Sequence, residues 1–395
     1  MNAINNLPDS TYWSIIPDKN VLKILTSPSR VIEFRPNKSK NLLTGEYFTP
    51  NTYDLLKNLL DVSVSEYQSS SKIIFHAYYE LGDFWYKTCN LPEDTILGYW
   101  LEFQEESPLH LKDRIDLERI EWNLPDYSLY REMFFKGKES LYNGDCYQFN
   151  LTMPILGRFQ NLNLLAFAGR FLGDSSKRGR FASLTRLDNK VLYSNSPECL
   201  GEIESRDNQL YFKSCPIKGT QSTEKLSKNK AWKKLKESPK DESELFMITD
   251  LLRNDLNQIG QHWVEVKKKK APLFVNNLVH SFSELEAQID NETTLYQVLR
   301  SVFPGGSITG VPKKRVMKIL KKLENKKRGF YCGSSLIFGK GAMKLSINIR
   351  SGEIDLEKNQ ICYHSGGGIT VNSTPENEFT ELLDKFTSFV SLLNE

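Results

Sequence analysis

The chain has 395 residues, of which 39% are hydrophobic, and its formal net charge is +3. This length allows two or three domains or one large one, and the composition is that of a globular protein with a sizeable core. A nearly neutral chain gives no reason to expect a nucleic-acid partner, and no apolar run reaches the ~18 residues of a membrane span. We therefore expect a protein that binds neither nucleic acid nor membrane.

The six cysteines are scattered, and no two of them form a CxxC pair. This distribution is typical of free thiols in a reducing compartment and argues against a zinc site or a disulfide framework. The first residues contain neither the basic segment nor the apolar segment of a signal peptide. These features predict a cytoplasmic protein.

Residues 1–125 show only short strand-like runs, at 21–25, 31–34, 72–79 and 96–103, separated by polar turns. Residues 104–126 are polar and have the composition of a linker. We therefore predict an N-terminal region, 1–125, that packs on a catalytic core formed by 126–395.

The core begins with a predicted helix at 127–142, which ends at an Asn-Gly pair, and continues with a predicted strand at 145–151. Gln148 lies in that strand. A neutral amide cannot act as a base at pH 7, so Gln148 either contacts a ligand or bonds to neighbouring backbone.

Three short segments between residues 196 and 256 carry chemically reactive side chains. Glu198 and Lys218 each stand near a predicted strand end, where Pro and Gly interrupt an apolar pattern. Glu244 begins a segment, 244–255, whose leucines and isoleucine recur at helical spacing. Two carboxylates and a lysine on three separate elements could converge; the alternative is three unrelated surface groups.

A glycine-rich segment, 304–312, precedes a predicted helix whose apolar face consists of Val316, Ile319, Leu320 and Leu323. Such a turn presents backbone N–H groups to an anion, although an ordinary capped turn has the same composition. It is not a Walker phosphate loop, because Val-Pro follows Gly310 where Lys-Ser/Thr is required.

Residues 342–350 alternate between apolar and polar side chains, so one face of a predicted strand, ending with Arg350, is either wet or lines a cavity. The three glycines Gly366, Gly367 and Gly368 let the backbone approach a ligand closely.

The C-terminal helix is predicted to begin at Thr374-Pro375, a cap residue followed by proline at the first helical position. Its acidic residues Glu378 and Glu381 share a stripe with Lys385, either as an exposed ion pair or, with Glu244, as ligands of Mg²⁺. The predicted buried stripe consists of Phe379, Leu382, Leu383, Phe386 and Val390.

Together these motifs resemble those of the chorismate-utilising enzymes, over residues 126–390, and within that family they are most similar to the aminodeoxychorismate synthases (component I). The resemblance implies an α+β fold with large antiparallel sheets, helices outside and the active site in a cleft between them. It also implies conversion of chorismate and ammonia to 4-amino-4-deoxychorismate, on the route to para-aminobenzoate and folate.

The resemblance further assigns roles to residues of this sequence. Glu198 would be the general acid, Lys218 the nucleophile that adds at ring carbon C2, and His280 a group near C4. Mg²⁺ would be held by Glu244 and Glu381, with Glu378 and Asp241 nearby. The substrate would be contacted by Gln148, Thr220, Ser307, Tyr331, Arg350, Gly366, Gly367, Gly368 and Lys385.

Three alternatives remain open at this point. An anthranilate synthase would carry Ala where Lys218 stands, and an isochorismate synthase would carry Lys in place of Gln148. A catalytically inactive scaffold for an amidotransferase would have lost the acids that are present here. The sequence has no recognisable amidotransferase domain, so ammonia is expected from a glutamine amidotransferase on a separate chain.

Overall fold

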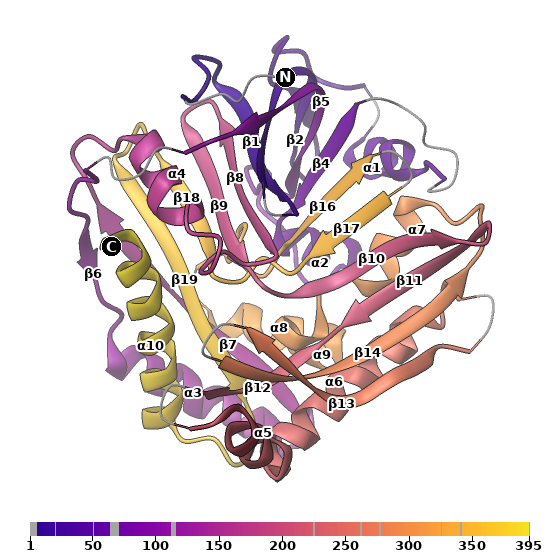
Figure 1. Cartoon of the computed structure of the whole chain (residues 1–395), viewed down its shortest axis with the longest axis vertical. Helices are drawn as coiled ribbons and strands as arrows, with labels where there is room; N and C mark the ends of the chain where they lie inside the picture. The colour runs from indigo at the N-terminus through magenta and orange to yellow at the C-terminus, as the bar shows by residue number, and fades with distance from the viewer. Residues whose placement is uncertain are drawn as a thin grey trace.

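The computed structural model describes residues 6–19, 21–49, 51–63, 71–111, 116–223, 226–260, 263–275, 278–324, 326–339 and 342–394. These residues form ten helices and nineteen strands, and every strand pairing among them is antiparallel. The helices lie outside the sheet (Figure 1). The prediction of an α+β fold with large antiparallel sheets is confirmed.

The strands form one long ribbon with two arms, which meet at the pair of β4 (Lys72–Ala77) and β5 (Gly98–Leu109). The first arm runs through β16 (Ser334–Gly339), β17 (Ala342–Ser346), β10 (Cys199–Arg206), β11 (Gln209–Cys215) and β14 (Leu278–Ile289), with β12 (Ile217–Ser222) and β13 (Glu265–Val275) on opposite edges of β14.

The second arm leaves β5 in the other direction. It runs through β2 (Val21–Phe34), β1 (Tyr12–Asp18), β8 (Phe181–Leu187), β9 (Lys190–Ser196), β18 (Ser351–Asp355), β19 (Gln360–Ile369) and β7 (Gln148–Arg158), with β3 (Ser39–Asn41) beside β2, and β6 (Glu121–Asn123) and β15 (Gly310–Val311) beside β7. Strands from residues 1–125 thus pair directly with later strands. The division into an N-terminal region, 1–125, and a core, 126–395, is a proposal.

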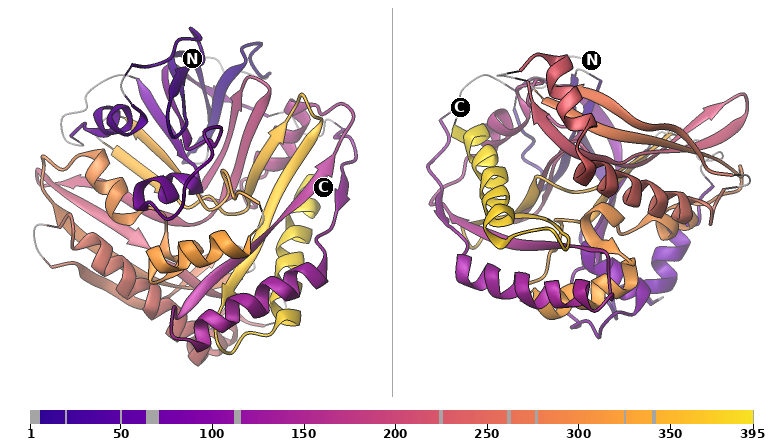
Figure 2. Two further views of the ribbon diagram at one scale, coloured as in Figure 1. Left: turned by 180° about the vertical axis from the view of Figure 1, so that it is seen from behind. Right: turned by 90° about the horizontal axis from the view of Figure 1, so that it is seen from below.

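Two large apolar cores fill the ribbon and its helices. One lies between the first arm and four helices: α1 (Thr52–Leu60), α2 (Tyr79–Tyr86), α6 (Pro239–Leu256) and α7 (Leu295–Val302). The other lies between the second arm and α3 (Tyr127–Tyr142), α4 (Leu164–Leu172), α9 (Lys313–Leu323) and α10 (Pro375–Asn394) (Figure 2). The remaining helices are α5 (Lys228–Lys236), which packs on β12 and β14, and the single turn α8 (Gly306–Thr309).

Several helices match their predicted positions. Helix α3 has the predicted bounds and begins where the Asp126 carboxylate accepts a hydrogen bond from the Leu129 N–H group. The predicted apolar face of α9 is buried as a whole. In α10, Leu382 and Phe386 of the predicted stripe are fully buried, together with Phe389 and Leu393, which were not predicted. The other predicted members, Phe379, Leu383 and Val390, are only half-buried at the edge of the core.

Two predictions about irregular and extended segments are wrong. Residues 104–126 are not a linker throughout, since β5 continues to Leu109 along β2, and β6 pairs with β7; residues 112–115 lie outside the described part. Glu105 is exposed and Glu106 pairs with Lys23 and Lys72, so this paired strand has the polar composition of a loop. The predicted strand at 342–350 ends at Ser346, and the chain turns at Arg350, whose φ is 51°.

Among the described residues, none of the helices combines the length and the apolar character that crossing a membrane would require. All six cysteines are free thiols.

A buried polar network links the two arms near β4. The His76 ring contacts the Ser335 hydroxyl through Nδ1 at 2.8 Å and the Thr185 hydroxyl through Nε2 at 2.9 Å. Thr185 in turn lies 2.8 Å from the Ser14 hydroxyl. Complete burial lowers the pKa of His76 from 6.5 to about 3, because the imidazolium would lose its hydration there. The fold therefore holds His76 as a neutral imidazole.

This burial predicts an acid-dependent loss of stability. The folded-state pKa of His76 is below the unfolded value of 6.5, so its contribution is complete above pH 6.5 and is lost as the pH falls toward 3. Between pH 6 and 4.5 the free energy of unfolding of the wild type should fall more steeply than that of His76→Gln, by about 1.4 kcal/mol per pH unit. Urea unfolding followed by tryptophan fluorescence measures both slopes.

All other titrating groups are shared by the two proteins and cancel in this comparison. Parallel slopes would mean that His76 titrates in the folded state as it does in the unfolded chain.

Candidate active site

Glu198 lies in the short connection between β9 and β10, and its backbone is fixed on both sides. Its N–H group donates to the Ser196 hydroxyl at 3.1 Å, and its carbonyl accepts from the Ile347 N–H group at 3.1 Å. The side chain is buried and accepts a 2.8 Å hydrogen bond from the Ser307 hydroxyl on α8. Burial raises the pKa of Glu198, although Ser307 and the charges of Lys218 and Lys385 oppose the shift. This carboxyl group can hold a proton for transfer.

Lys218 lies in β12, opposite Ser281 of β14, at an irregularity in the pairing. Its ammonium nitrogen is 3.8 Å from Glu244 Oε2 on α6, and both side chains are largely buried. Lys218 also acts electrostatically on Glu198, so the two carboxylates and the lysine do converge from three separate elements.

The three glycines lie inside strand β19, opposite Asn150 to Thr152 of β7. A Cβ atom on Gly368 would be 2.3 Å from the Gln148 amide nitrogen and 3.7 Å from the Lys218 ammonium. A Cβ atom on Gly367 would be 3.1 Å from Glu378 Oε2. A side chain at Gly367 or Gly368 would therefore have to displace groups of α10, β7 or β12.

Helix α10 contributes the acidic side chains. Glu378, expected either in an exposed ion pair or at a metal site, is buried and accepts a 2.7 Å hydrogen bond from the Ser373 hydroxyl. Glu381 forms a 2.8 Å ion pair with Lys385, which also donates to the Gly366 carbonyl at 2.7 Å. Burial raises the pKa of Glu378, and the negative charges of Glu381 and Glu244 raise it further.

A cation already lies among these carboxylates. The Lys240 ammonium is 3.8 Å from Glu378 Oε1 and 4.0 Å from Glu244 Oε1. Glu244 Oε1 is buried and has no hydrogen-bond partner. Carboxylate oxygens of this kind suit Mg²⁺, so Glu244, Glu378 and Glu381 fit a divalent cation chemically.

The carboxylates are not assembled into a complete metal site as they stand. Across the described part of the chain, no group of three or more His, Cys, Asp or Glu side chains lies close enough to hold a metal ion. Asp241 lies at the start of α6, and its Oδ1 would be 2.8 Å from a Cβ atom on Gly219, next to Lys218.

The remaining predicted residues lie around this centre. Gln148 is fully buried, and neither atom of its amide group has a hydrogen-bond partner. The Thr220 hydroxyl is 2.8 Å from His280 Nδ1. Burial lowers the pKa of His280 to about 4, with a smaller effect from the Arg350 charge, so His280 is neutral at pH 7.

Arg350 and Tyr331 differ in exposure. Arg350 is exposed, whereas Tyr331 is buried and stacks on His364 with ring centroids 5.4 Å apart.

Sequence reasoning missed two buried charged contacts that support the site. Arg328 pairs with Glu324 at 2.7 Å and donates to the Ile308 carbonyl, next to Ser307, at 2.8 Å. Lys313 pairs with Asp255 at 2.9 Å, both side chains being buried. Lys313 and Asp255 are 58 residues apart in sequence. Arg328 follows Glu324 by four residues but lies beyond the end of α9, so helical spacing does not predict their contact. Lys240, four residues before Glu244 on one helix, could have been found by its spacing.

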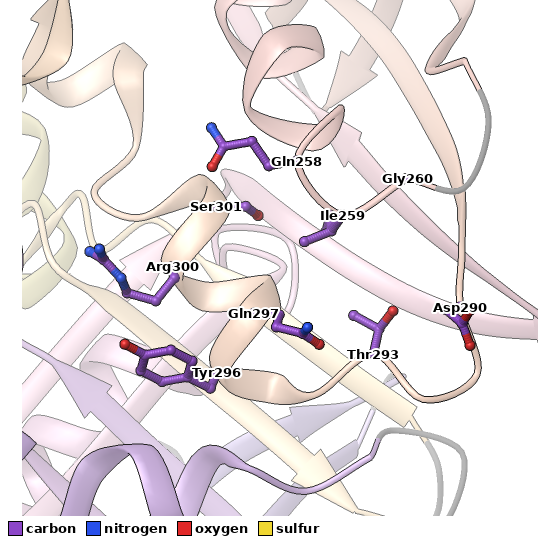
Figure 3. A pocket seen from close by; sticks show the side chains of 9 residues that line it. All are labelled: Gln258, Ile259, Gly260, Asp290, Thr293, Tyr296, Gln297, Arg300 and Ser301. Atoms are coloured by element: carbon purple, nitrogen blue, oxygen red, sulfur yellow. The ribbon is translucent and has the colours of Figure 1, made fainter. Parts of the chain in front are cut away.

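A separate pocket of about 490 Å³ lies beside the C-terminal end of α6 and helix α7 (Figure 3). None of the site residues described above lines it. Its lining residues are Gln258, Ile259, Gly260, Asp290, Thr293, Tyr296, Gln297, Arg300 and Ser301.

Three comparisons with known proteins, by family model, by sequence and by structure, point to the same family. A family model described as chorismate binding enzyme matches residues 52–391. Aminodeoxychorismate synthase component 1 of Escherichia coli (strain K12) is 32% identical over 308 residues, which cover 75% of this chain and 64% of that protein. Anthranilate synthase component 1 of Archaeoglobus fulgidus is 26% identical over 278 residues, 69% of this chain and 65% of that protein.

The chain thus matches slightly less than two thirds of the length of either relative. Among solved structures, anthranilate synthase component I from Streptococcus pneumoniae TIGR4 superposes with a TM-score of 0.79 at 19% identity, covering 98% of this chain and 94% of that one. At this identity the superposition shows the fold. The family model covers most of the sequence, and the chain therefore belongs to the chorismate binding enzymes.

Proposed function

We propose that the chain is the chorismate-converting component of an aminodeoxychorismate synthase, which forms 4-amino-4-deoxychorismate and water from chorismate and ammonia. The observation that carries the proposal is Lys218, largely buried, 3.8 Å from Glu244 and within electrostatic reach of Glu198. The 32% identity to a protein with that name supports the same member of the family.

The first half of the proposed reaction uses Lys218 and Glu198. The neutral Lys218 amine forms a bond to ring carbon C2, and the two ring double bonds shift as the bond from C4 to its hydroxyl breaks. Glu198 gives its proton to the departing hydroxyl, which leaves as water. The raised pKa of Glu198, caused by burial, suits it to carry that proton, and Ser307 holds the carboxyl group in place.

The second half reverses the double-bond shift. Ammonia forms a bond to C4, the bond between C2 and Lys218 breaks, and the lysine leaves as a neutral amine. The new ammonium group returns one proton to the Glu198 carboxylate, which restores the starting enzyme. Holding all partners in place replaces one difficult displacement by two assisted ones.

Binding of the dicarboxylate substrate is assigned to the groups around this centre. Mg²⁺ held by Glu244 and Glu381, with Glu378 and Asp241 beside them, would supply positive charge for one substrate carboxylate. Arg350, Tyr331 and the β19 glycines are proposed for the other carboxylate, and Gln148, Thr220, Ser307, His280 and Lys385 for the ring.

Two enzymatic alternatives are less well supported. An anthranilate synthase has a named relative at 26% identity, but Lys218 stands where the family resemblance gives Ala. An isochorismate synthase needs a base that activates water, and the neutral amide of Gln148 stands in its place. Four intact carboxylates and an unpartnered Glu244 oxygen argue against an inactive scaffold.

Substitution of the nucleophile tests the choice within the family. Lys218→Ala should lose most of the 4-amino product, since C4 then lacks the covalent step, and added ammonia should yield some 2-amino product. Lys218→Arg should not restore activity, because a guanidinium stays protonated. Wild type incubated with chorismate but no ammonia should carry added substrate mass on the peptide containing Lys218. Unchanged 4-amino product from Lys218→Ala would refute the nucleophile role.

Substitution of a metal-site carboxylate tests the cation. Glu381→Ala should lose most turnover and should weaken activation by Mg²⁺, whereas Asp384→Ala, an exposed acid on the same helix, should change neither. Initial rates over a Mg²⁺ titration measure both effects. Full wild-type activity in excess EDTA would contradict the metal assignment.

The nitrogen source tests the expected amidotransferase partner. The purified chain should convert chorismate with ammonium salt and not with glutamine, and its rate at fixed total ammonium should rise toward pH ~9, because only the deprotonated amine attacks. Identification of the product by mass is the direct test of the proposed function. Glutamine turnover by the single chain would contradict the need for a second protein.

A further inference from the structure

Helix α5 concentrates positive charge on one short element. Its nine residues include five lysines and no acidic residue. The whole chain carries a formal net charge of only +3, so the rest of the protein is net negative. The lysine cluster of α5 consists of Lys228, Lys230, Lys233, Lys234 and Lys236, all exposed.

Stability of the helix does not account for this charge. Lys228 and Lys230 stand in the first turn, where the positive end of the helix dipole disfavours cations. Like charges three and four residues apart repel each other. Among the described residues, only Lys233 of the cluster has a carboxylate within ion-pair distance, Glu237 at 3.9 Å, and that pair is mostly exposed to solvent.

The helix that carries the cluster packs, through its buried face, on strands of the candidate active site. Ala231 and Leu235 form a small apolar core with Val279 of β14, next to His280. A methyl carbon of Leu235 would be 2.7 Å from a Cβ atom on Gly219, the neighbour of Lys218 in β12. Figure 1 shows α5 against β12 at the end of the molecule where α10 begins. The helix therefore covers the strand that carries the proposed nucleophile.

Nearby acids do not cancel the charge. Glu242 is paired with Lys270 at 2.7 Å, and Glu244 and Glu378 are already near the Lys240 ammonium. Asp241, beside Gly219, adds one negative charge, which the five lysines of α5 outnumber, so the exposed face of α5 remains positively charged. A local field of one sign raises the concentration of oppositely charged ligands and their rate of encounter.

We infer that the lysine cluster of α5 is an electrostatic capture surface for the dianionic substrate, acting before any direct contact in the site. This inference rests on the proposed function, because chorismate carries two carboxylates. It assigns to α5 a role in the encounter and none in the chemical step. The cluster therefore contributes to kcat/KM and not to kcat.

The test is the triple variant Lys230→Gln, Lys233→Gln, Lys234→Gln, assayed with chorismate and ammonium without any partner protein. At ionic strength ~10 mM we expect kcat/KM for chorismate to fall roughly five-fold with kcat unchanged. At ~0.5 M the difference should shrink below about two-fold, because screening then acts within a few ångströms. Ionic strength is set with a salt that leaves the ammonium concentration constant.

A matched control removes the same number of charges elsewhere: Lys57→Gln, Lys318→Gln, Lys322→Gln, on the exposed faces of α1 and α9. It should change kcat/KM less than two-fold at either ionic strength. Equal effects from the two triple variants, or a loss that persists at high salt, would overturn the inference. Thermal unfolding of both variants checks that the fold is intact.

Two further outcomes separate the inference from the proposed function. Wild type that binds and converts chorismate, with no effect of the α5 substitutions, would refute the capture surface alone. Wild type that does not bind chorismate by calorimetry would refute both. A loss seen only when glutamine and an amidotransferase are supplied would make α5 a docking surface for that partner and would also overturn substrate capture.

Discussion

The candidate site exists because the two arms of one β-ribbon end side by side. Lys218 lies on the first arm, and Gly368 and Gln148 lie on the second, yet a Cβ atom on Gly368 would be 3.7 Å from the lysine ammonium. Helices α8 and α9 lie between the arms. Arg328, which follows α9, donates to the Ile308 carbonyl of α8 and, at 2.5 Å, to the Asn150 carbonyl of β7. A guanidinium suits this position because it can serve several acceptors in fixed directions.

The cations buried between the arms, Arg328 and Lys313, are each paired with a group of opposite charge. The buried pair of Lys313 and Asp255 fixes the start of α9 to the end of α6, and Lys313 also donates to the Val302 carbonyl at 3.3 Å. Removing one partner of such a pair typically costs about 3–5 kcal/mol, because the other charge stays buried alone. The same reasoning explains why Glu378, raised in pKa by burial and by neighbouring acids, needs a cation nearby.

Sequence patterns predicted those features that depend on local periodicity. The bounds of α3 and the buried face of α9 follow from caps and from apolar spacing alone. The family resemblance predicted the fold class. Patterns failed where tertiary contacts override local signals: β5 extends through a run of glutamates because β2 offers a pairing partner. For Glu378 the pattern left an exposed and a metal-site reading open, and the side chain is buried with a hydrogen bond from Ser373.

The candidate site was predictable in part, since convergence of Glu198, Lys218 and Glu244 was one of two readings of the sequence and is the one the structure has. The supporting contacts were not, because Arg328 reaches Asn150 across 178 residues of sequence. A buried arginine in a polar-looking turn reads as a surface residue until the fold is known. Burial of a charged side chain is a property of the assembled core, and no window of sequence contains that information.

The order Lys218-Gly219-Thr220 has a physical reason of its own. The pairing of β12 with β14 shifts register between Lys218 and Thr220, and Gly219 adopts a φ of 78°, which side chains other than glycine rarely allow. A Cβ atom there would also meet Leu235 of α5 and Asp241 of α6 at 2.7 and 2.8 Å. Bulges of this kind change the direction of a side chain beside a functional site. The glycine thus fixes where the lysine points and, through the same contacts, how closely the two helices approach the strand.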